Sequence, residues 1–260
     1  MSYGICTLNS VALRKEPSNR SEMVSQILFG ETFVITESED HWLKIISDFD
    51  SYEAWVHKEQ IVFINSDIYS KITANNSTVS NEFITFISNK NNDLQTITMG
   101  SSLPLFKKNT FKFSDHIYEF EGKINSSKLS KNKLIRTAYL LLNTPFLWGG
   151  RTPLGLDCSG FIQLVYKING YKLFRDSVQQ VTQGEVLSFI EESEPGDLAF
   201  FDNEEGEIVH VGIILADHHI IHCHEKVRID RLDQSGIYNI DRKRHTHKLR
   251  VLKQIFKGDY

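Results

Sequence analysis

The strongest constraint on this chain is a glycine-rich loop that runs directly into an apolar helix near its middle. Residues 144–157 carry three glycines, whose missing side chains allow close backbone packing and positive φ angles. After this loop, apolar side chains recur at helical spacing as far as Asn169-Gly170, a typical helix end. The pattern predicts a helix that begins at Cys158, with Asp157 as its N-cap.

A cysteine in the first turn of a helix is a candidate nucleophile. Unpaired backbone N–H groups and the positive end of the helix dipole favour an anion there. Such surroundings can lower a cysteine pKa from about 8.5 to roughly 3.5–7.5. The competing interpretation is that Cys158 is a small buried apolar residue, as a lone cysteine usually is.

Two histidines further along the chain favour the nucleophile interpretation. His210 lies in a run with the period-2 pattern of a strand, and a turn at 217–218 would bring the strand 219–224 back beside it. His210 and His222 would then be neighbours across the hairpin. One imidazole can take the thiol proton while the second orients it. Each histidine alone is better explained as an ordinary satisfied or exposed side chain, but together with Cys158 they predict a cysteine hydrolase.

Four segments of the chain resemble the NlpC-type cell-wall peptidases, papain-like enzymes with a Cys-His-His triad or another polar third member. They are Trp-Gly-Gly at 148–150, Asp-Cys-Ser-Gly-Phe at 157–161, Pro-Gly-Asp-Leu-Ala-Phe-Phe at 195–201 and His-Val-Gly-Ile at 210–213. The resemblance covers roughly residues 130–260 and implies hydrolysis of peptide bonds in bacterial peptidoglycan stems. It makes Cys158 the nucleophile, His210 the base and His222 the orienting residue.

Composition narrows the class of protein further. A net charge of −4 over 260 residues offers no basic excess to neutralise nucleic-acid phosphates, so nucleic acid is not expected as a partner. The three cysteines are widely spaced and suggest no disulfide framework. We expect no membrane association, because no signal-peptide pattern and no apolar run of spanning length is present. A cytoplasmic location is therefore expected, and it would keep a catalytic thiol reduced.

The first 64 residues read as a small barrel. Five short β-type runs are separated by turn residues, at 11–14, 24–29, 32–36, 42–46 and 53–56. Segments within 13–17, 29–31, 42–45 and 52–56 resemble the bacterial SH3-like domain that precedes NlpC-type domains. Residues 1–64 are therefore predicted to be a first SH3-like domain.

Residues 65–128 read as a small all-β segment. We predict a divergent second SH3-like domain here, mainly because the related enzymes carry two. Residues 129–260 form the predicted papain-like catalytic domain, with helices from Ser130 and from Ser177 to Val186 and with strands at 198–201, 208–215, 220–224 and 249–256. Helices first and an antiparallel sheet afterwards give the α+β fold class.

A narrower resemblance concerns the substrate. The chain is similar to γ-D-glutamyl-L-diamino acid endopeptidases of the dipeptidyl-peptidase VI type, which release L-Ala-γ-D-Glu from stem peptides with a free N-terminal L-alanine. The resemblance implies a substrate site made of Asp157, Ser159, Asp176, Ser177, Glu22 and Tyr52, the last two from the first barrel. It also implies a role in murein peptide recycling.

A substrate ammonium group needs carboxylates around it, and Asp176 and Glu22 would supply the charge. Without the resemblance, Asp176 is as well explained as an ordinary loop acid, and Glu22 is better explained as a surface acid. Phe146 is a departure from the family, which usually has a tyrosine twelve residues before the nucleophile. The missing hydroxyl predicts weaker turnover but not inactivity.

Two other classes of function stay open. A wall-fragment binding protein with little or no turnover would keep the same residues. A metal site would use the histidines and cysteine of 218–224, but on a strand these side chains divide between two faces, so we expect neither a metal nor another cofactor. The oligomeric state and the preferred diamino acid do not follow from the sequence.

Overall fold

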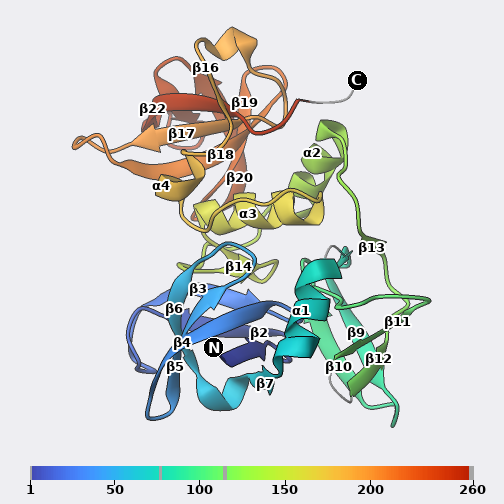
Figure 1. Cartoon of the computed structure of the whole chain (residues 1–260). Helices are drawn as coiled ribbons and strands as arrows, with labels where there is room; N and C mark the ends of the chain where they lie inside the picture. The colour runs from blue at the N-terminus through green and yellow to red at the C-terminus, as the bar shows by residue number, and fades with distance from the viewer. Residues whose placement is uncertain (1, 76–77, 114–115, 258–260) are drawn as a thin grey trace. The chain divides into compact units, whose positions relative to one another are not determined.

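The computed structural model describes residues 2–75, 78–113 and 116–257, and the chain divides into two compact units (Figure 1). The first unit consists of Met1–Ser127 together with Trp148–Pro153. The second consists of Lys128–Leu147 and Leu154–Tyr260. The glycine-rich loop before Cys158 is thus divided, and its middle section belongs to the first unit.

An antiparallel sheet with the strand order β3-β2-β6-β5-β4-β1-β7 opens the first unit. Its strands are β1 (Ser2–Ile5), β2 (Ser10–Arg14), β3 (Met23–Leu28), β4 (Thr32–Glu39), β5 (Trp42–Ser47), β6 (Glu53–His57) and β7 (Val62–Ile64), with the short helix η1 (Lys58–Gln60) before β7. Alternate side chains, such as Val11 and Leu13 of β2, point into a common apolar core. The five predicted strands are confirmed, and β1 and β7 were not predicted.

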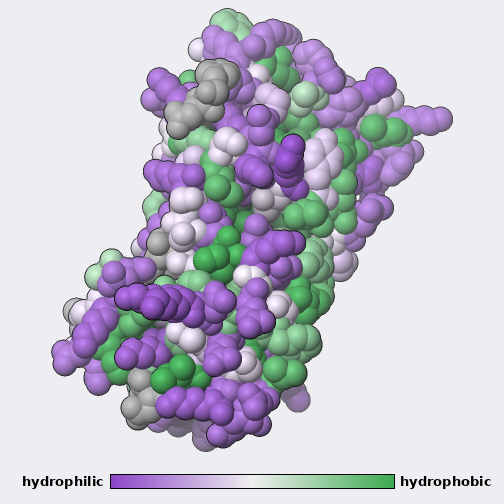
Figure 2. Space-filling model, turned by 90° about the vertical axis from the view of Figure 1, so that its right-hand side faces the viewer, coloured by the Kyte–Doolittle hydropathy of each residue, from purple (hydrophilic) through white to green (hydrophobic). Residues whose placement is uncertain are grey.

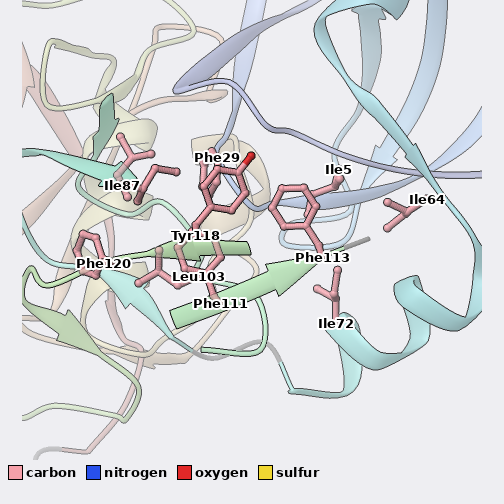
Figure 3. Close-up of a cluster of buried hydrophobic side chains, with 11 residues drawn as sticks. Ile5, Phe29, Ile64, Ile72, Ile87, Leu103, Phe111, Phe113, Tyr118 and Phe120 are labelled. Carbon is pink, nitrogen blue, oxygen red and sulfur yellow. The ribbon is translucent and has the colours of Figure 1, made fainter. Parts of the chain in front are cut away.

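The rest of the first unit combines one helix with short strands. These are α1 (Ser66–Asn75), β8 (Val79–Ser80), β9 (Ile84–Asn89), β10 (Leu94–Thr98), β11 (Thr110–Phe113), β12 (His116–Glu119) and β13 (Ile124–Asn125). Strands β10-β9-β12-β11 form one sheet, and β13 pairs with β8. Figure 3 shows Phe111, Phe113 and Tyr118 beside Ile5 and Phe29 of residues 1–64, the segment predicted as the first barrel, so both parts of this unit share one core.

The prediction of an all-β segment at 65–128 is wrong because of α1. The Asn65 side chain accepts a hydrogen bond from the backbone N–H of Ile68 at 2.9 Å, which caps the start of this helix. Ile72 is fully buried, one helical turn after Ile68. The i, i+4 pair of isoleucines is a helical signal that the strand interpretation overlooked.

Helices come first in the second unit. They are α2 (Lys131–Leu140), α3 (Cys158–Ile168) and α4 (Ser177–Gln180), followed by the short helix η2 (Ile190–Glu192). Every residue of α3 after Cys158 is buried, including the polar residues Ser159, Gln163 and Lys167. Asn169 and Gly170 end this helix, the latter with a φ of 82°, so the predicted end of α3 is confirmed.

The helix predicted from Ser177 to Val186 is too long. It ends at Gln180, and Val186 lies instead in strand β16 (Glu185–Leu187), paired with the last strand of the chain. Gly184 has a φ of 74°, a left-handed conformation that redirects the backbone between the two elements.

Most of the second unit is a bent antiparallel sheet. Its strand order is β16-β22-β17-β18-β19-β20-β21, and a further pairing between β21 and β22 closes the sheet on itself. The strands are β17 (Leu198–Asp202), β18 (Ile208–Leu215), β19 (His219–His224), β20 (Lys226–Asp233), β21 (Gly236–Asn239) and β22 (Arg244–Gln254), and the short strand β15 (Gly155–Leu156) precedes α3. The short strand β14 (Arg151–Thr152) belongs to the first unit. Helix α3 packs against β18 and β19. Helices before an antiparallel sheet agree with the predicted order, although strands dominate the chain.

Within the described ranges, none of the helices has the length and apolar character needed to cross a bilayer. Hydrophilic and hydrophobic side chains are interspersed on the face drawn in Figure 2.

Candidate active site

Cys158 is the first residue of α3, as predicted. Asp157 is the N-cap, and its Oδ1 accepts a hydrogen bond from the backbone N–H of Gly160 at 2.6 Å. Backbone N–H groups of Ser159 and Val211 reach the Cys158 sulfur. Because Val211 follows His210 directly in β18, this contact places the thiol beside the strand that carries the predicted base.

The expected lowering of the thiol pKa is wrong. Burial, and after it the negative charge of Asp157, raise the pKa of the Cys158 thiol to about 12, against the opposing effect of Arg175. The free-energy cost of removing the thiolate from water is larger here than the stabilisation that the helix N-terminus provides. Cys158 is therefore a neutral thiol in the free protein.

Arg175 organises the turn around the nucleophile. This residue is completely buried, and its guanidinium group pairs with the Asp157 carboxylate and donates to the Ser159 hydroxyl at 2.9 Å. Asp157 and Ser159 were predicted to bind substrate, and both are held in place by this one cation. The prediction singled out Asp176-Ser177 and overlooked the arginine beside them.

The two predicted histidines are in direct contact. His210 Nε2 lies 2.8 Å from His222 Nδ1, and both side chains are buried. The predicted turn is present, with Asp217 and His218 both at positive φ. In the hairpin register Gly212, not His210, is directly opposite His222.

Gly212 makes room for this contact. A Cβ atom at this position would lie 2.6 Å from the side chain of Ile220 and 3.0 Å from the Cβ of His222. Such distances are shorter than normal contacts between carbon atoms. A glycine opposite His222 therefore lets this side chain lean toward His210.

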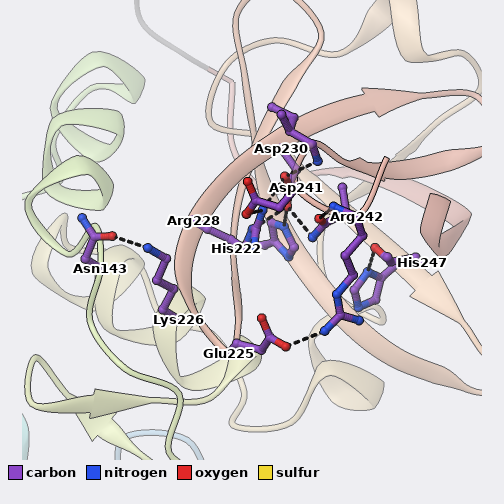
Figure 4. Close-up of polar contacts among 12 residues, drawn as sticks. Asn143, His222, Glu225, Lys226, Arg228, Asp230, Asp241, Arg242 and His247 are labelled. Carbon is purple, nitrogen blue, oxygen red and sulfur yellow. Dashed lines mark hydrogen bonds and ion pairs between the residues drawn. The ribbon is translucent and has the colours of Figure 1, made fainter. Parts of the chain in front are cut away.

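A buried carboxylate extends the pair of histidines. His222 Nε2 lies 3.1 Å from Asp230 Oδ2, and Asp230 is completely buried. Arg228 binds the same carboxylate through two N–H groups, at 2.7 Å and 3.0 Å. Figure 4 draws Asp230 together with His222 and Arg228.

The charges of this chain of residues follow from burial and hydrogen bonding. Burial lowers the pKa of His210 well below its usual value, and the neighbouring His222 and His247 lower it further. Burial also lowers the pKa of His222, although Asp230 opposes that shift. Burial alone would raise the pKa of Asp230, but hydrogen bonds from His222 and Arg228 outweigh it and lower the pKa to about 2. Near neutral pH the carboxylate is ionised and both imidazoles are neutral.

Sequence reasoning missed Asp230, although a signal was present. In β20 the buried residues include Asp230 and Leu232, which share one face of the strand. An acid on the inward face of an apolar strand is rare unless it has a partner. The position therefore indicated a buried carboxylate that holds a cation or an imidazole.

Asp176 and Ser177 lie at the start of α4, in the same unit as the histidines. Asp176 is the N-cap and is half-buried, and Ser177 is buried. Helix α4 packs against β18, the strand of His210.

Glu22 and Tyr52 belong to the first unit. Glu22 accepts a hydrogen bond from the indole N–H of Trp148 at 2.7 Å and forms an ion pair with Lys15 at 3.6 Å. Tyr52 is half-buried against the core of the first barrel. Within this unit the predicted contact residue Glu22 is thus tied to Trp148 of the glycine-rich loop.

A buried ion pair fixes the same loop within the first unit. Arg151 and Glu31 are almost completely buried, and two guanidinium N–H groups reach the Glu31 carboxylate at 3.0 Å and 3.1 Å. Such a bidentate pair holds both position and orientation. Its effect is to anchor Trp148–Pro153 on the first barrel.

Phe146 occupies the position where the resemblance leads one to expect a tyrosine. Its backbone N–H donates to the carbonyl of Glu225 at 2.9 Å, and its side chain is 40% exposed. Because Phe146 is partly exposed, a hydroxyl group added to its ring need not be buried.

Comparisons with known proteins agree with this site. Residues 143–246 match the model of the NlpC/P60 family, and residues 13–61 match that of the bacterial dipeptidyl-peptidase Sh3 domain. A protein of Bacillus subtilis (strain 168) named gamma-D-glutamyl-L-lysine dipeptidyl-peptidase is 28% identical over 237 residues, which cover 84% of this chain and 74% of the relative. Dipeptidyl-peptidase 6 of Lysinibacillus sphaericus is 24% identical over 264 residues, and the match covers 88% of this chain and 92% of that relative.

A solved structure has the same fold over nearly the whole chain. An NlpC/P60 family protein from Bacillus cereus superimposes with a TM-score of 0.81 at 18% identity, covering 98% of this chain and 99% of that one. The Cys158 helix, the contact of His210 with His222 and the two family matches agree with one another. This protein therefore carries an NlpC/P60 domain together with a bacterial dipeptidyl-peptidase SH3 domain.

Proposed function

We propose that this protein is a cysteine peptidase that cuts the bond between γ-D-glutamate and the diamino acid in peptidoglycan stem peptides with a free N-terminal L-alanine. The products are L-Ala-γ-D-Glu and a peptide that begins with the diamino acid. The observation that carries the proposal is the contact of 2.8 Å between His210 and His222, on strands packed against the helix that begins at Cys158.

In the first half of the reaction, Cys158 attacks the carbonyl carbon of the γ-glutamyl bond while its proton passes to His210. The tetrahedral intermediate collapses to a thioester, and His210 returns the proton to the leaving amine. Backbone N–H groups in the first turn of α3 are the donors available to the developing oxyanion.

In the second half, water attacks the thioester. His210 takes a proton from the water, and the Cys158 sulfur leaves and recovers a proton, which regenerates the neutral thiol. The chemistry is balanced without a cofactor, and each proton passes through His210.

The thiol and the imidazole start as a neutral pair, because the pKa of Cys158 is raised and that of His210 is lowered. We therefore expect proton transfer to accompany attack rather than to precede it. The site then forms its charged imidazolium only when a substrate carbonyl is in place.

The proposed substrate class rests on the names of the relatives and on residues that match the resemblance. Two relatives are named gamma-D-glutamyl-L-lysine dipeptidyl-peptidase. Asp176 would hold the ammonium group of L-alanine, with Ser177 next to it in the sequence and the turn at Asp157-Ser159 bound by the neighbouring Arg175. Glu22 and Tyr52 of the first barrel would contribute to the same cage.

We propose three domains, with boundaries at 1–64, 65–128 and 129–260. The second would be a divergent SH3-like domain, supported by its four-stranded antiparallel sheet, with α1 as an addition. The third would be papain-like, with its nucleophile at the start of a buried helix. Recycling of wall peptides in the cytosol is the setting proposed for this specificity.

Mass spectrometry of two tripeptides tests the proposal. L-Ala-γ-D-Glu-L-Lys and its N-acetylated form are incubated with the protein and with Cys158→Ala. We expect release of L-Ala-γ-D-Glu from the free peptide by the wild type, none with Cys158→Ala, and far slower cleavage of the acetylated peptide. A site built around a polar group can reject an analogue lacking it by about 10⁴–10⁵. The same tripeptide with meso-diaminopimelate as its third residue covers the other common diamino acid. No cleavage of either free tripeptide by the folded wild type would leave a wall-fragment binding protein as the better description.

Asp176→Asn tests the ammonium site separately. Its neutral amide loses most of the preference for a cation, so we expect the ratio of kcat/KM between free and acetylated peptides to fall. Glu191→Gln removes an exposed acid elsewhere in the same unit and is the matched control, expected to leave this ratio unchanged. Equal cleavage of both peptides by the wild type would indicate a general stem endopeptidase instead.

A further inference from the structure

Asp230 is surrounded by hydrogen-bond donors. Its Oδ1 faces an N–H group of Arg228 at 3.0 Å and the backbone N–H of Ile240 at 3.0 Å. Its Oδ2 faces Arg228 Nε at 2.7 Å, the Asn239 amide at 3.4 Å and His222 Nε2 at 3.1 Å. The two N–H groups of Arg228 and the backbone N–H of Ile240 donate whichever tautomer His222 adopts, and, against the opposing effect of burial, hydrogen bonds from His222, Arg228 and Ile240 lower the pKa of Asp230 to about 2. The arrangement therefore requires an ionised carboxylate that only accepts.

An acceptor at this place determines where the hydrogens lie on both histidines. Since Asp230 only accepts, His222 must carry its hydrogen on Nε2. In the neutral ring, His222 Nδ1 then has a lone pair and accepts from His210 Nε2, which must be the donor across their 2.8 Å contact. The lone pair of His210 therefore lies on Nδ1.

We propose that Asp230 is a positioning residue that acts through His222 to hold the catalytic base His210 in the tautomer with a lone pair on Nδ1. The inference rests on the proposed function for its catalytic consequence. It adds a fourth, charged member behind the cysteine and the two histidines, and it assigns the atom of His210 that receives the thiol proton.

The proton transfer is simple in this arrangement. The Cys158 proton moves to His210 Nδ1 as the sulfur forms its bond to the substrate carbonyl carbon. His210 becomes an imidazolium that still donates through Nε2 to His222, and His222 still donates to Asp230. No proton needs to move to the carboxylate, whose negative charge stabilises the imidazolium through the intervening ring.

Arg228 fixes the orientation of the Asp230 carboxylate. Its two hydrogen bonds keep the Asp230 carboxylate oriented, and Asp241 binds the same guanidinium group at 2.8 Å from the other side. Asp241 is largely exposed, with 76% of its side chain accessible, whereas Asp230 is completely buried. The two acids thus share one arginine, but of the two only Asp230 contacts His222, which makes Asp241 a matched control.

The tautomers can be read directly by long-range ¹H–¹⁵N correlation spectra of the full-length protein labelled with ¹⁵N-histidine. We expect the wild type to show His210 and His222 both protonated on Nε2, with Nδ1 carrying the lone pair. A wild-type spectrum with His222 protonated on Nδ1 would overturn the proposal without any need for a variant.

Asp230→Asn supplies the second test. An amide replaces one acceptor oxygen with a donor, so at least one of the surrounding N–H groups loses its partner. We expect mixed or reversed tautomers of His222 and His210 and a fall in kcat of about 10²–10⁴-fold, the range associated with misplaced general-base catalysis. Asp241→Asn should keep the wild-type tautomers and a kcat within about threefold, as expected for a surface residue.

Unchanged tautomers and a near-normal kcat in folded Asp230→Asn would also contradict the proposal. If Asp230→Asn does not fold, the wild-type spectrum still decides between the two tautomers. The proposed function is tested separately. If the protein shows the expected tautomers but cleaves no stem peptide, the role of Asp230 in setting the tautomers is supported and the proposed activity is disproved.

Discussion

His247 stacks on His210, with ring centroids 4.2 Å apart and planes inclined by 27°. His247 comes from β22 and His210 from β18, and strand β17 lies between these two strands in the sheet. His222 and His224 of β19 and Phe201 of β17 also face the His210 ring. The predicted base is therefore enclosed by aromatic rings, three of them imidazoles.

The rings around His210 predict that the protein stays active down to an unusually low pH. His210 must be unprotonated to accept the thiol proton, so the rate falls as pH drops through the pKa of His210. Because burial and then the neighbouring His222 and His247 lower that pKa well below about 6.5, the acid limb of kcat/KM should lie well below pH 6.5.

His247→Phe should move the acid limb to higher pH, because it keeps a stacked ring but removes one imidazole that lowers the His210 pKa. The limb should still lie below pH 6.5, since burial is the largest cause. His245→Phe is the control, because His245 lies on the same strand but is exposed and pairs with Asp233. The measurement is the pH profile of kcat/KM for the wild type, His247→Phe and His245→Phe. If the acid limb lies at the same pH in all three proteins, His247 has no influence on the pKa of His210.

The raised thiol pKa predicts slow alkylation of Cys158 in the free protein. With a pKa of about 12, the thiolate fraction at pH 7 is roughly 10⁻⁵, against a few per cent for an ordinary cysteine. Iodoacetamide should modify Cys158 far more slowly than it modifies glutathione, and the rate should rise about tenfold per pH unit between pH 7 and pH 9. Peptide mass mapping distinguishes Cys158 from Cys6 and Cys223. Fast alkylation that does not vary with pH would indicate a preformed thiolate–imidazolium pair.

Replacing the two histidines should have unequal effects. His210→Ala removes the base and should lower kcat by about 10²–10⁴-fold. In His222→Gln the amide oxygen can still accept from His210 and the amide N–H₂ can donate to Asp230, so the loss should stay within roughly tenfold, the value of about one hydrogen bond. Steady-state kinetics on the free tripeptide provide the comparison. Small and equal losses in both variants would contradict the assignment of the base.

Phe146→Tyr should raise kcat or leave it unchanged. The added hydroxyl restores the donor that the resemblance leads one to expect, and on this partly exposed ring it need not be buried. One well-placed donor to a developing oxyanion is worth about 2.7–4 kcal/mol, which sets the upper limit of the gain. Leu147→Tyr adds the same group at the next exposed position and is the control. A large fall in kcat with unchanged thermal stability would mean that the local structure depends on phenylalanine at this position.

Several parts of this protein could be predicted from the sequence because they depend on neighbouring residues. The start of α3 follows from Asp157 as N-cap and from the apolar periodicity after Cys158, and its end follows from Asn169-Gly170. The hairpin of β18 and β19 follows from two alternating runs around a turn at Asp217-His218. These signals are local, so they do not require knowledge of the fold. The short α1 was overlooked because its apolar signal is confined to Ile68, Tyr69 and Ile72.

Tertiary structure decided the chemistry of the site. Asp230 reaches His222 only because β20 pairs with β19 in a register that puts Ile220 opposite Asp230. Arg175 reaches Asp157 only because the loop after α3 folds back onto the start of that helix. The thiol pKa likewise depends on burial, which outweighs the local effect of a helix N-terminus. Helix caps and turns are set by a few consecutive residues, whereas burial and long-range hydrogen bonds depend on which distant residues the fold brings together. The sequence therefore determined which residues are available for catalysis, and only the folded chain decided their protonation states and their partners.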